Sequence, residues 1–460
     1  MLMTACSARV VDSAEAPIEG ASGGSPTTSG TPGSGGRIDQ VTGSTGAHGG
    51  TSPKYPRPVA IDGSAGNSGV PSGSDAGQAG AASADAGIAP PHTICAVPPV
   101  PAVPAAGTGA LSVCAPKTCA GIPADADVWA NWDRNLPASD YAGCTSVTGS
   151  IVVAMTTNTD LAELSCLEHV GGNVLVWYNP GLTTLHGLES LRLVEGSLLI
   201  ARSGSLSAPN ENLRSLAALG SLEVVGKDLI LDLALPLPEL DGFNALVAVG
   251  GDLAFHSSTY QPTPVPKPTD VSGFGALASI GGNLLFEWVD ELVRVTGFGS
   301  LTAIGGSITV NGATDLVSFA GFPRLSCLGK SFSVFRSYLE ENTALRSIGP
   351  FPSLDRIGGS VRVEGTPNLE SIDLFGKVGR LDGGTLRILS NPKLSTVPVE
   401  SFSWAGDDIV FGDNASLPIC PLLDLKARLE GAGYTHHFAL TGGLDCPEGT
   451  ACAGTICAAR

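Results

Sequence analysis

Aromatic side chains make up only 5% of the 460 residues, and charged side chains only 15%. No run of 18 or more consecutive apolar residues occurs, so the sequence predicts no transmembrane helix. Positive charge is also scarce, because 25 Lys and Arg stand against 43 Asp and Glu, which gives a formal net charge of −18. This shortage argues against a nucleic-acid partner, whose phosphates attract clustered Lys and Arg. It suits a soluble, self-repelling surface.

Complete catalytic motifs are missing as well. The segment GASGG at 20–24 fits the nucleophile-elbow pattern, but no strand or helix is expected around it. The segments GFG at 273–275 and 297–299 lack the third glycine of a nucleotide-binding fingerprint. The adjacent pair His436 and His437 has no Cys or carboxylate pattern to complete a metal site. The sequence therefore predicts no cofactor, no metal and no catalysis.

The N-terminal fifth of the chain is short of apolar residues. Residues 7–91 are mostly Gly, Ser, Ala, Thr and Pro, with Tyr55 as the one aromatic residue. Such a segment buries too little apolar surface to offset the entropy of ordering, so a disordered linker with a span of about 50 Å is expected. Before it, Leu2-Met3-Thr4-Ala5-Cys6 resembles a bacterial lipobox, which implies a residual signal at 1–6 and a lipid on Cys6. A basic region and a longer apolar run are missing from that signal.

Cysteine is plentiful in comparison, with 11 residues gathered before and after the middle of the chain. Their positions predict disulfide-rich caps at 92–148 and 420–460, made in an oxidising compartment. The pairing stays open, as does whether the isolated Cys327 is a free thiol. A zinc site is the alternative, but no C-x2-C pair is present. The candidates for disulfide bonds are Cys95, Cys114, Cys119, Cys144, Cys166, Cys420, Cys446, Cys452 and Cys457.

A unit of about two dozen residues recurs over residues 149–419, and repetition at this period is typical of a solenoid. Each unit has an alternating apolar pair just after a glycine corner, and period-two spacing sends both members to one face of a strand. Stacking the units in order gives parallel strands with an apolar interior. The inward pairs are Ile151/Val153, Val174/Val176, Leu198/Ile200, Leu229/Leu231, Leu253/Phe255, Leu284/Phe286, Ile308/Val310, Phe332/Val334, Val361/Val363, Leu386/Ile388 and Ile409/Phe411.

Three further features belong to the repeat. An L-x-x-[IV] step precedes each strand, and the glycine after it is expected to make a corner through a positive φ. An asparagine recurs three residues before a leucine and is expected to bond to neighbouring backbone and to the next coil's asparagine. Residues 421–430 form the one good helix candidate, expected to cover the last coil. The asparagines are Asn158, Asn179, Asn342, Asn391 and Asn414.

These motifs resemble the receptor L-domain, a leucine-rich-repeat-like family that also occurs in bacterial surface lipoproteins. The segment YAGCTSVTGSIVV resembles its first coil, LPICPLLDLKARL resembles its closing cap, and the resemblance covers about Asp127 to Cys446. It implies an all-β, right-handed parallel β-helix, here of about eleven rungs with disulfide-rich caps. It also implies binding of a ligand through an outer face of the coil. No individual binding residue is transferred by it.

The outward strand positions supply the candidate ligand-binding residues. One outward row is apolar over its first six strands, and this row either forms a contact surface, packs only on itself, or lies beneath the segment from Cys95 to Gly143. Asp232, His256 and Glu287 make the most enzyme-like cluster of the second row. The full set of candidates is Leu175, Trp177, Leu199, Ile230, Asp232, His256, Leu285, Glu287, Phe335 and Glu364.

Three functions remain open at this point. The first is a non-catalytic recognition or adhesion module, lipid-anchored at the bacterial outer membrane or cell surface, with an extracellular protein or glycan as partner. The second is a structural envelope protein that associates with copies of itself. The third is a carbohydrate-active β-helix enzyme, which requires acids and bases from consecutive coils within hydrogen-bond reach.

Overall fold

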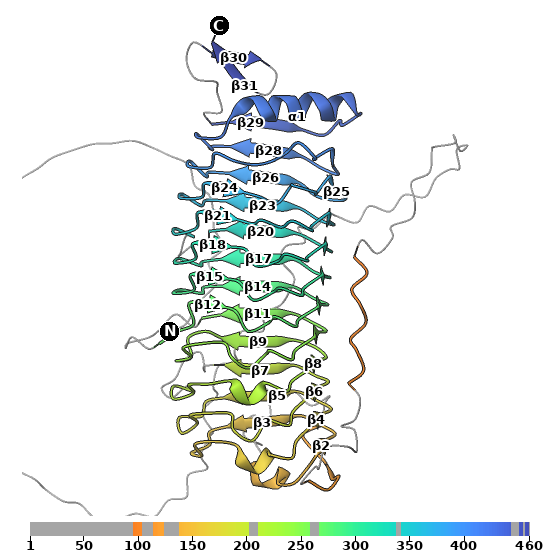
Figure 1. Ribbon diagram of the computed structural model, residues 1–460, viewed down its shortest axis with the longest axis vertical. Helices are drawn as coiled ribbons and strands as arrows, with labels where there is room; N and C mark the ends of the chain where they lie inside the picture. Colours follow the sequence, from red (N-terminus) through yellow and green to blue (C-terminus); the bar gives the residue numbers. More distant parts are fainter. Residues whose placement is uncertain are drawn as a thin grey trace, which may run out of the picture. The chain divides into compact units, whose positions relative to one another are not determined.

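Stacked parallel strands dominate the computed structural model of the chain (Figure 1). It describes residues 95–103, 114–123, 138–201, 210–257, 266–336, 342–442, 450–453 and 456–459. Cys6, the expected linker at 7–91 and Cys446 lie outside these residues. Within them the fold is an all-β parallel solenoid with a single α-helix.

Each of the eleven predicted strands is present and is four residues long. With one further strand they form a parallel sheet, named here the long-strand sheet. Its members are β3 (Ile151–Ala154), β5 (Val174–Trp177), β7 (Leu198–Ala201), β9 (Leu229–Asp232), β11 (Leu253–His256), β14 (Leu284–Glu287), β17 (Ile308–Asn311), β20 (Phe332–Phe335), β23 (Val361–Glu364), β26 (Leu386–Leu389), β28 (Ile409–Gly412) and β29 (Phe438–Thr441).

The L-x-x-[IV] steps lead into a second parallel sheet, the short-strand sheet, whose strands have two residues each. Its members are β1 (Thr118–Cys119), β2 (Ser146–Val147), β4 (His169–Val170), β6 (Leu193–Val194), β8 (Val224–Val225), β10 (Ala248–Val249), β13 (Ser279–Ile280), β16 (Ala303–Ile304), β19 (Cys327–Leu328), β22 (Arg356–Ile357), β25 (Arg380–Leu381) and β27 (Trp404–Ala405).

A third parallel sheet joins five of the middle coils. It consists of β12 (Asp270–Val271), β15 (Arg294–Val295), β18 (Ser318–Phe319), β21 (Ser347–Ile348) and β24 (Ser371–Ile372). An antiparallel hairpin of β30 (Thr450–Ala453) and β31 (Ile456–Ala459) follows the solenoid in the sequence and places Cys452 opposite Cys457. Short 3-10 turns occur at Ala138–Tyr141, Ala162–Leu164 and Ala217–Leu219.

The inward residues of the long-strand sheet form the core, as the alternation predicts. Every inward pair is buried, and Val176, Phe286 and Ile388 are fully enclosed. Phenylalanines add a column that runs along the stack, in which neighbouring rings stack with centroids 5.0–5.6 Å apart. Offset aromatic pairs of this kind stabilise a core beyond the area that they bury. The column consists of Phe243, Phe274, Phe298, Phe322 and Phe351.

The glycine corners are confirmed in position, but the expected positive φ is wrong. Gly250, Gly281 and Gly305 all lie outside the left-handed region. Close stacking is the reason for glycine instead. A Cβ on Gly281 would lie 2.1 Å from the carbonyl oxygen of Gly250, and one on Gly305 would lie 2.2 Å from that of Gly281. The coils can approach at the spacing of β-strands only where no side chain intervenes.

The expected ladder of asparagines is present in part: Asn342 bonds to the backbone of Ala313 and Phe335 and to no asparagine among the described residues, and Asn158 is exposed. Asn179 donates from its backbone N–H to Oδ1 of Asn210 at 2.9 Å, and its side chain donates to the carbonyl of Val153. Asn391 and Asn414 repeat this arrangement near the other end of the stack. These fully buried amides satisfy backbone groups at the turns, so their role is structural.

A second polar ladder was missed by the sequence analysis. The residue after each glycine corner accepts, through its side-chain oxygen, the backbone N–H of the equivalent residue on the next coil, at 2.6–3.2 Å. The position always holds a short polar residue, and this regularity was the available signal. The ladder runs through Ser150, Asn173, Ser197, Asp228, Asp252, Asn283, Ser307, Ser331, Ser360 and Thr385.

The predicted helix is α1 (Ile419–Gly431), and it lies at the end of the stack (Figure 1). Leu422, Leu425 and Leu429 form its buried face. Arg428 donates to the backbone carbonyls of Val399 and Phe402 and so fixes the helix on the last coil. The described residues include no helix with the length and apolarity that a membrane crossing requires.

Three disulfides are described, and one of them departs from the expected arrangement. Cys114–Cys166 and Cys119–Cys144 join residues at the N-terminal end of the stack. Cys95, in contrast, is bonded to Cys327, which lies in the middle of the solenoid 232 positions later. Cys327 is therefore not a free thiol. Cys420 is disulfide-bonded too.

Candidate ligand-binding face

The outer face of the long-strand sheet carries all ten candidate ligand-binding residues. Its strands are in unbroken register, so equivalent outward residues are direct neighbours along the whole stack. Neighbouring positions are therefore about 4.8 Å apart. One outward row of this face has an apolar stretch from β3 to β14 and a polar stretch from β17 to β26.

The apolar stretch is packed and not open to solvent. Leu175 is 3% exposed, and Leu199 and Leu285 are each 8% exposed. Leu175 and Leu199 belong to a second apolar cluster, separate from the main core, against which Trp177 and Ile230 pack. Ile122, from the cysteine-rich segment, belongs to this cluster as well. Among the open alternatives, the structure thus favours burial of this row, partly beneath the segment before the solenoid.

Asp232, His256 and Glu287 are neighbours on consecutive strands, as the outward register predicts. Asp232 is fully buried, and its Oδ1 accepts the backbone N–H of Ala234 at 2.8 Å. Burial raises the pKa of Glu287, and the nearby His256 opposes this shift. The Nδ1 atom of His256 is buried and makes no hydrogen bond.

The described contacts of this group do not include the hydrogen bond that orients a catalytic histidine. General-base catalysis by histidine requires a ring that is oriented by a hydrogen bond, commonly from Nδ1 to an acid. The Nδ1 of His256 lacks this bond, and Oδ1 of Asp232 accepts the backbone N–H of Ala234. The three residues form a polar column on the sheet, in which Asp232 is fully buried and His256 and Glu287 are half-buried.

The polar stretch presents a compact group that is built on β20, β23 and β26. The guanidinium of Arg362 lies over the ring of Phe335, 4.9 Å from its centroid. Oε2 of Glu364 accepts a hydrogen bond from Nη2 of Arg362 at 2.6 Å, and Oε1 accepts one from Nε of Arg387 at 3.1 Å. The side chains of both arginines are 47% exposed, whereas that of Glu364 is only 16% exposed. We name Phe335, Arg362, Glu364 and Arg387 the arginine cluster.

The charge of Glu364 is stabilised within this cluster. Burial alone would raise its pKa, but hydrogen bonds from Arg362 and Arg387, together with their charges, hold it below its ordinary value. A lowered carboxyl pKa gives a stabilising contribution that is present above the ordinary pKa and is lost as the pH falls through the folded-state value. The cluster is therefore intact at neutral pH.

Phe335 and Glu364 are candidates of the sequence analysis, and the structure brings them together. Arg362 and Arg387, which occupy outward positions of β23 and β26, were not among the candidates. Their alignment in register on adjacent strands was the signal that could have identified them.

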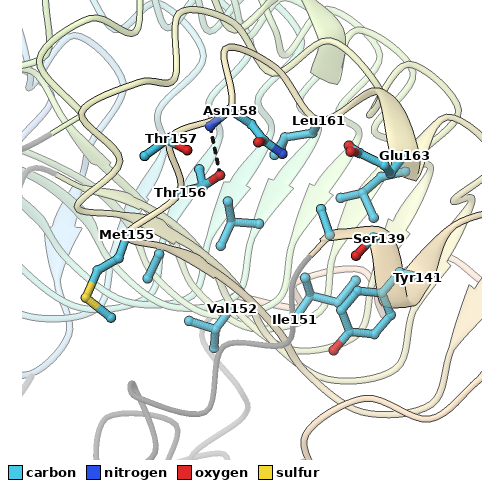
Figure 2. Close-up of a pocket in the computed structure, with 14 residues that line it drawn as sticks. Ser139, Tyr141, Ile151, Val152, Met155, Thr156, Thr157, Asn158, Leu161 and Glu163 are labelled. Atoms are coloured by element: carbon cyan, nitrogen blue, oxygen red, sulfur yellow. Dashed lines mark hydrogen bonds between the residues drawn. The ribbon is translucent and has the colours of Figure 1, made fainter.

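A cavity of about 470 Å³ lies at the N-terminal end of the stack, between β3 and the turns at Ala138–Tyr141 and Ala162–Leu164 (Figure 2). Its described lining is mostly apolar and hydroxyl-bearing, and Glu163 is its one carboxylate. The hydroxyl of Tyr141 is buried without a hydrogen-bond partner. Histidine, cysteine and lysine are missing from this described lining.

One group of potential metal ligands occurs in the described part of the chain. Single ligand atoms of Asp407, Asp408 and His436 lie within 4.8 Å of one another, at the C-terminal end of the solenoid. Asp407 and His436 are exposed, and Asp408 accepts the backbone N–H of His437 at 3.1 Å. Exposed groups of this kind are common without an ion, so they assign no metal to the protein.

Comparison of the chain with protein-family models, with curated proteins and with solved structures finds no match in any of the three.

Proposed function

We propose that the chain is a non-catalytic recognition module of the bacterial cell surface, and that its ligand binds the polar stretch of the long-strand sheet. The observation that carries this proposal is the arginine cluster. Its two arginine side chains are each 47% exposed, and they are held in place by Phe335, by Glu364 and by the rigid strands. Binding surfaces gain affinity when their groups are ordered before the ligand arrives, and Arg and aromatic residues are enriched at such surfaces.

The rest of the chain supports a position outside the cytoplasm. Disulfides persist in oxidising compartments, and Cys95, Cys119 and Cys144 all form them. In this proposal Cys6 carries a lipid, residues 7–91 tether the solenoid, and the cysteine-rich segments at 92–148 and 420–460 cap a right-handed receptor L-domain-like coil of about eleven rungs. The lipobox-like residues and the repeat motif are the grounds for these parts of the proposal.

Binding of the full-length protein to arrays of glycans and of extracellular proteins tests the function. We expect retention of at least one ligand, and a loss of about tenfold or more in affinity for Phe335→Ala, since the ring supports Arg362. Val317→Ala is the matched control, because Val317 is an exposed apolar residue outside the long-strand sheet. Equal loss in both variants, or unchanged binding in Phe335→Ala, would contradict the proposed face.

The two other functions predict different outcomes of the same experiment. An array ligand that is cleaved after binding would indicate a carbohydrate-active enzyme. Concentration-dependent association of the full-length protein in sedimentation, with no array ligand retained, would indicate a self-associating envelope protein.

A further inference from the structure

We infer that the ligand of the arginine cluster is a carboxylate-bearing polysaccharide; this inference rests on the proposed function. The outward row here runs through Thr309, Ser333, Arg362 and Arg387, which are direct neighbours in register. The row therefore presents two hydroxyls followed by two guanidiniums at intervals of about 4.8 Å. Such a line suits a linear polymer that carries hydroxyls and carboxylates at regular intervals.

The local charge favours an anion although the chain as a whole is acidic. Two guanidiniums share the single carboxylate of Glu364, which leaves one net positive charge in the cluster. Each guanidinium has five N–H donors, of which Glu364 occupies few, so donors remain for a second carboxylate. The contact with Phe335 holds the plane of Arg362 in place for such a bidentate pair.

A glycan fits this surface better than a protein partner does. Protein interfaces have an apolar or aromatic centre that becomes fully buried. The apolar part of the long-strand sheet is already covered, and Phe335 is half-buried under Arg362. The open part of the face thus consists mainly of polar groups.

Polygalacturonate is the probe, and its methyl ester is the matched neutral polymer. We expect the full-length protein to bind polygalacturonate with an affinity that falls as salt is added, and to bind the ester at least tenfold more weakly. R362A/R387A should lose at least tenfold in affinity for polygalacturonate. R356A/R380A should retain it, because these two exposed arginines lie in the same two coils but on the short-strand sheet.

Equal binding of the acid and the ester, or equal loss in the two double variants, would overturn the acidic ligand. These results are separable from failure of the proposed function. If the wild-type protein binds a neutral glycan or a protein ligand, and Phe335→Ala loses that binding, the proposed binding face is correct and only the ligand class is wrong.

A separate observation concerns the segment Cys95–Val103, named here the strap. It runs beside the coils along the stack and is fixed by the Cys95–Cys327 disulfide (Figure 1). A Cβ added to Gly305 would lie 3.1 Å from a methyl carbon of Val97 in the strap. A Cβ added to Gly250 would lie 3.1 Å from a methyl carbon of Val100. From Cys95 to Val100 the strap therefore runs toward the N-terminal end of the stack, from the coil of Cys327 past those of Gly305 and Gly250.

The outer side of the short-strand sheet is shaped for the strap. Its outward residues in the covered coils are Ala248, Ser279 and Ala303, which are small and at most 6% exposed. The strap itself contains three prolines, at 98, 99 and 101, which cannot donate the hydrogen bonds of a strand. It therefore packs across the sheet through side chains and is held covalently at Cys327.

We infer that the strap carries tension from the N-terminus directly to the coil of Phe335, the first of the three coils that carry the arginine cluster. Cys327 begins β19, and the same coil continues into β20, which ends at Phe335. A pull on the chain before Cys95 passes through the disulfide to this coil, because the covalent path is shorter than the path through the residues between Cys95 and Cys327. The coils before β19 are then bypassed by the load.

Single-molecule pulling between the two ends of the full-length protein tests this path. In the oxidised wild-type protein the residues between Cys95 and Cys327 should add nothing to the extension. In C95S/C327S they should add on the order of 600 Å, at about 3.5 Å per residue, since Cys114–Cys166 still closes part of the loop. Equal extension of the two proteins would overturn the inference. Mapping of unreduced peptides, which should join Cys95 to Cys327, shows whether the bond formed.

Discussion

Replacing Phe286 by alanine is expected to lower the free energy of unfolding by about 3–5 kcal/mol. The side chain is fully enclosed, stacks on Phe255 with ring centroids 5.0 Å apart, and meets Phe319 edge-on at 5.5 Å. The substitution removes these contacts and leaves a cavity that the stacked coils cannot close, since each coil is held in register by its neighbours. Chemical denaturation followed by circular dichroism measures the change.

Phe335→Ala is the matched control for this experiment. Phe335 lies on the same sheet but points outward, and it is only half-buried. We expect this substitution to lower the free energy of unfolding by about 1 kcal/mol or less. A larger loss for Phe335→Ala than for Phe286→Ala would reverse the assignment of inner and outer faces.

Asn391→Ala is expected to destabilise the protein by about 2–3 kcal/mol. The Asn391 side chain is fully buried, and its Oδ1 accepts the backbone N–H of Thr366 at 3.1 Å. Its amide also donates to the carbonyl of Val363 and to Oδ1 of Asn414. Removal leaves the buried N–H of Thr366 without an acceptor, and a buried unsatisfied group costs about 1–3 kcal/mol. Denaturation in urea measures this loss in the free energy of unfolding.

The same motif supplies the control for this second prediction. Asn158 also precedes a leucine by three residues, but its side chain is exposed. Asn158→Ala is therefore expected to change the stability by less than about 0.5 kcal/mol. A loss for Asn391→Ala as small as the loss for Asn158→Ala would contradict a stabilising role of the buried amides.

Much of the candidate face could be predicted from the sequence, because alternation tells which side of a strand each residue occupies. Phe335 and Glu364 were placed on the outer face in this way. Strand register could have placed Arg362 beside Arg387, but the ion pairs of both with Glu364 could not be predicted, since they depend on how far the two side chains reach to the same carboxylate. Burial of Leu175 and Leu199 was equally open, because alternation gives the direction of a side chain and not what covers it.

The amino-acid sequence by itself determined the solenoid: a period of about two dozen residues, with an apolar pair after each corner, leaves stacked parallel strands as the way to bury every pair. Only the tertiary structure decided that Cys95 bonds to Cys327 and that the strap lies on the short-strand sheet. The physical reason is distance along the chain. Local patterns are repeated in every coil, whereas a contact between residues 232 positions apart depends on how the whole stack is assembled.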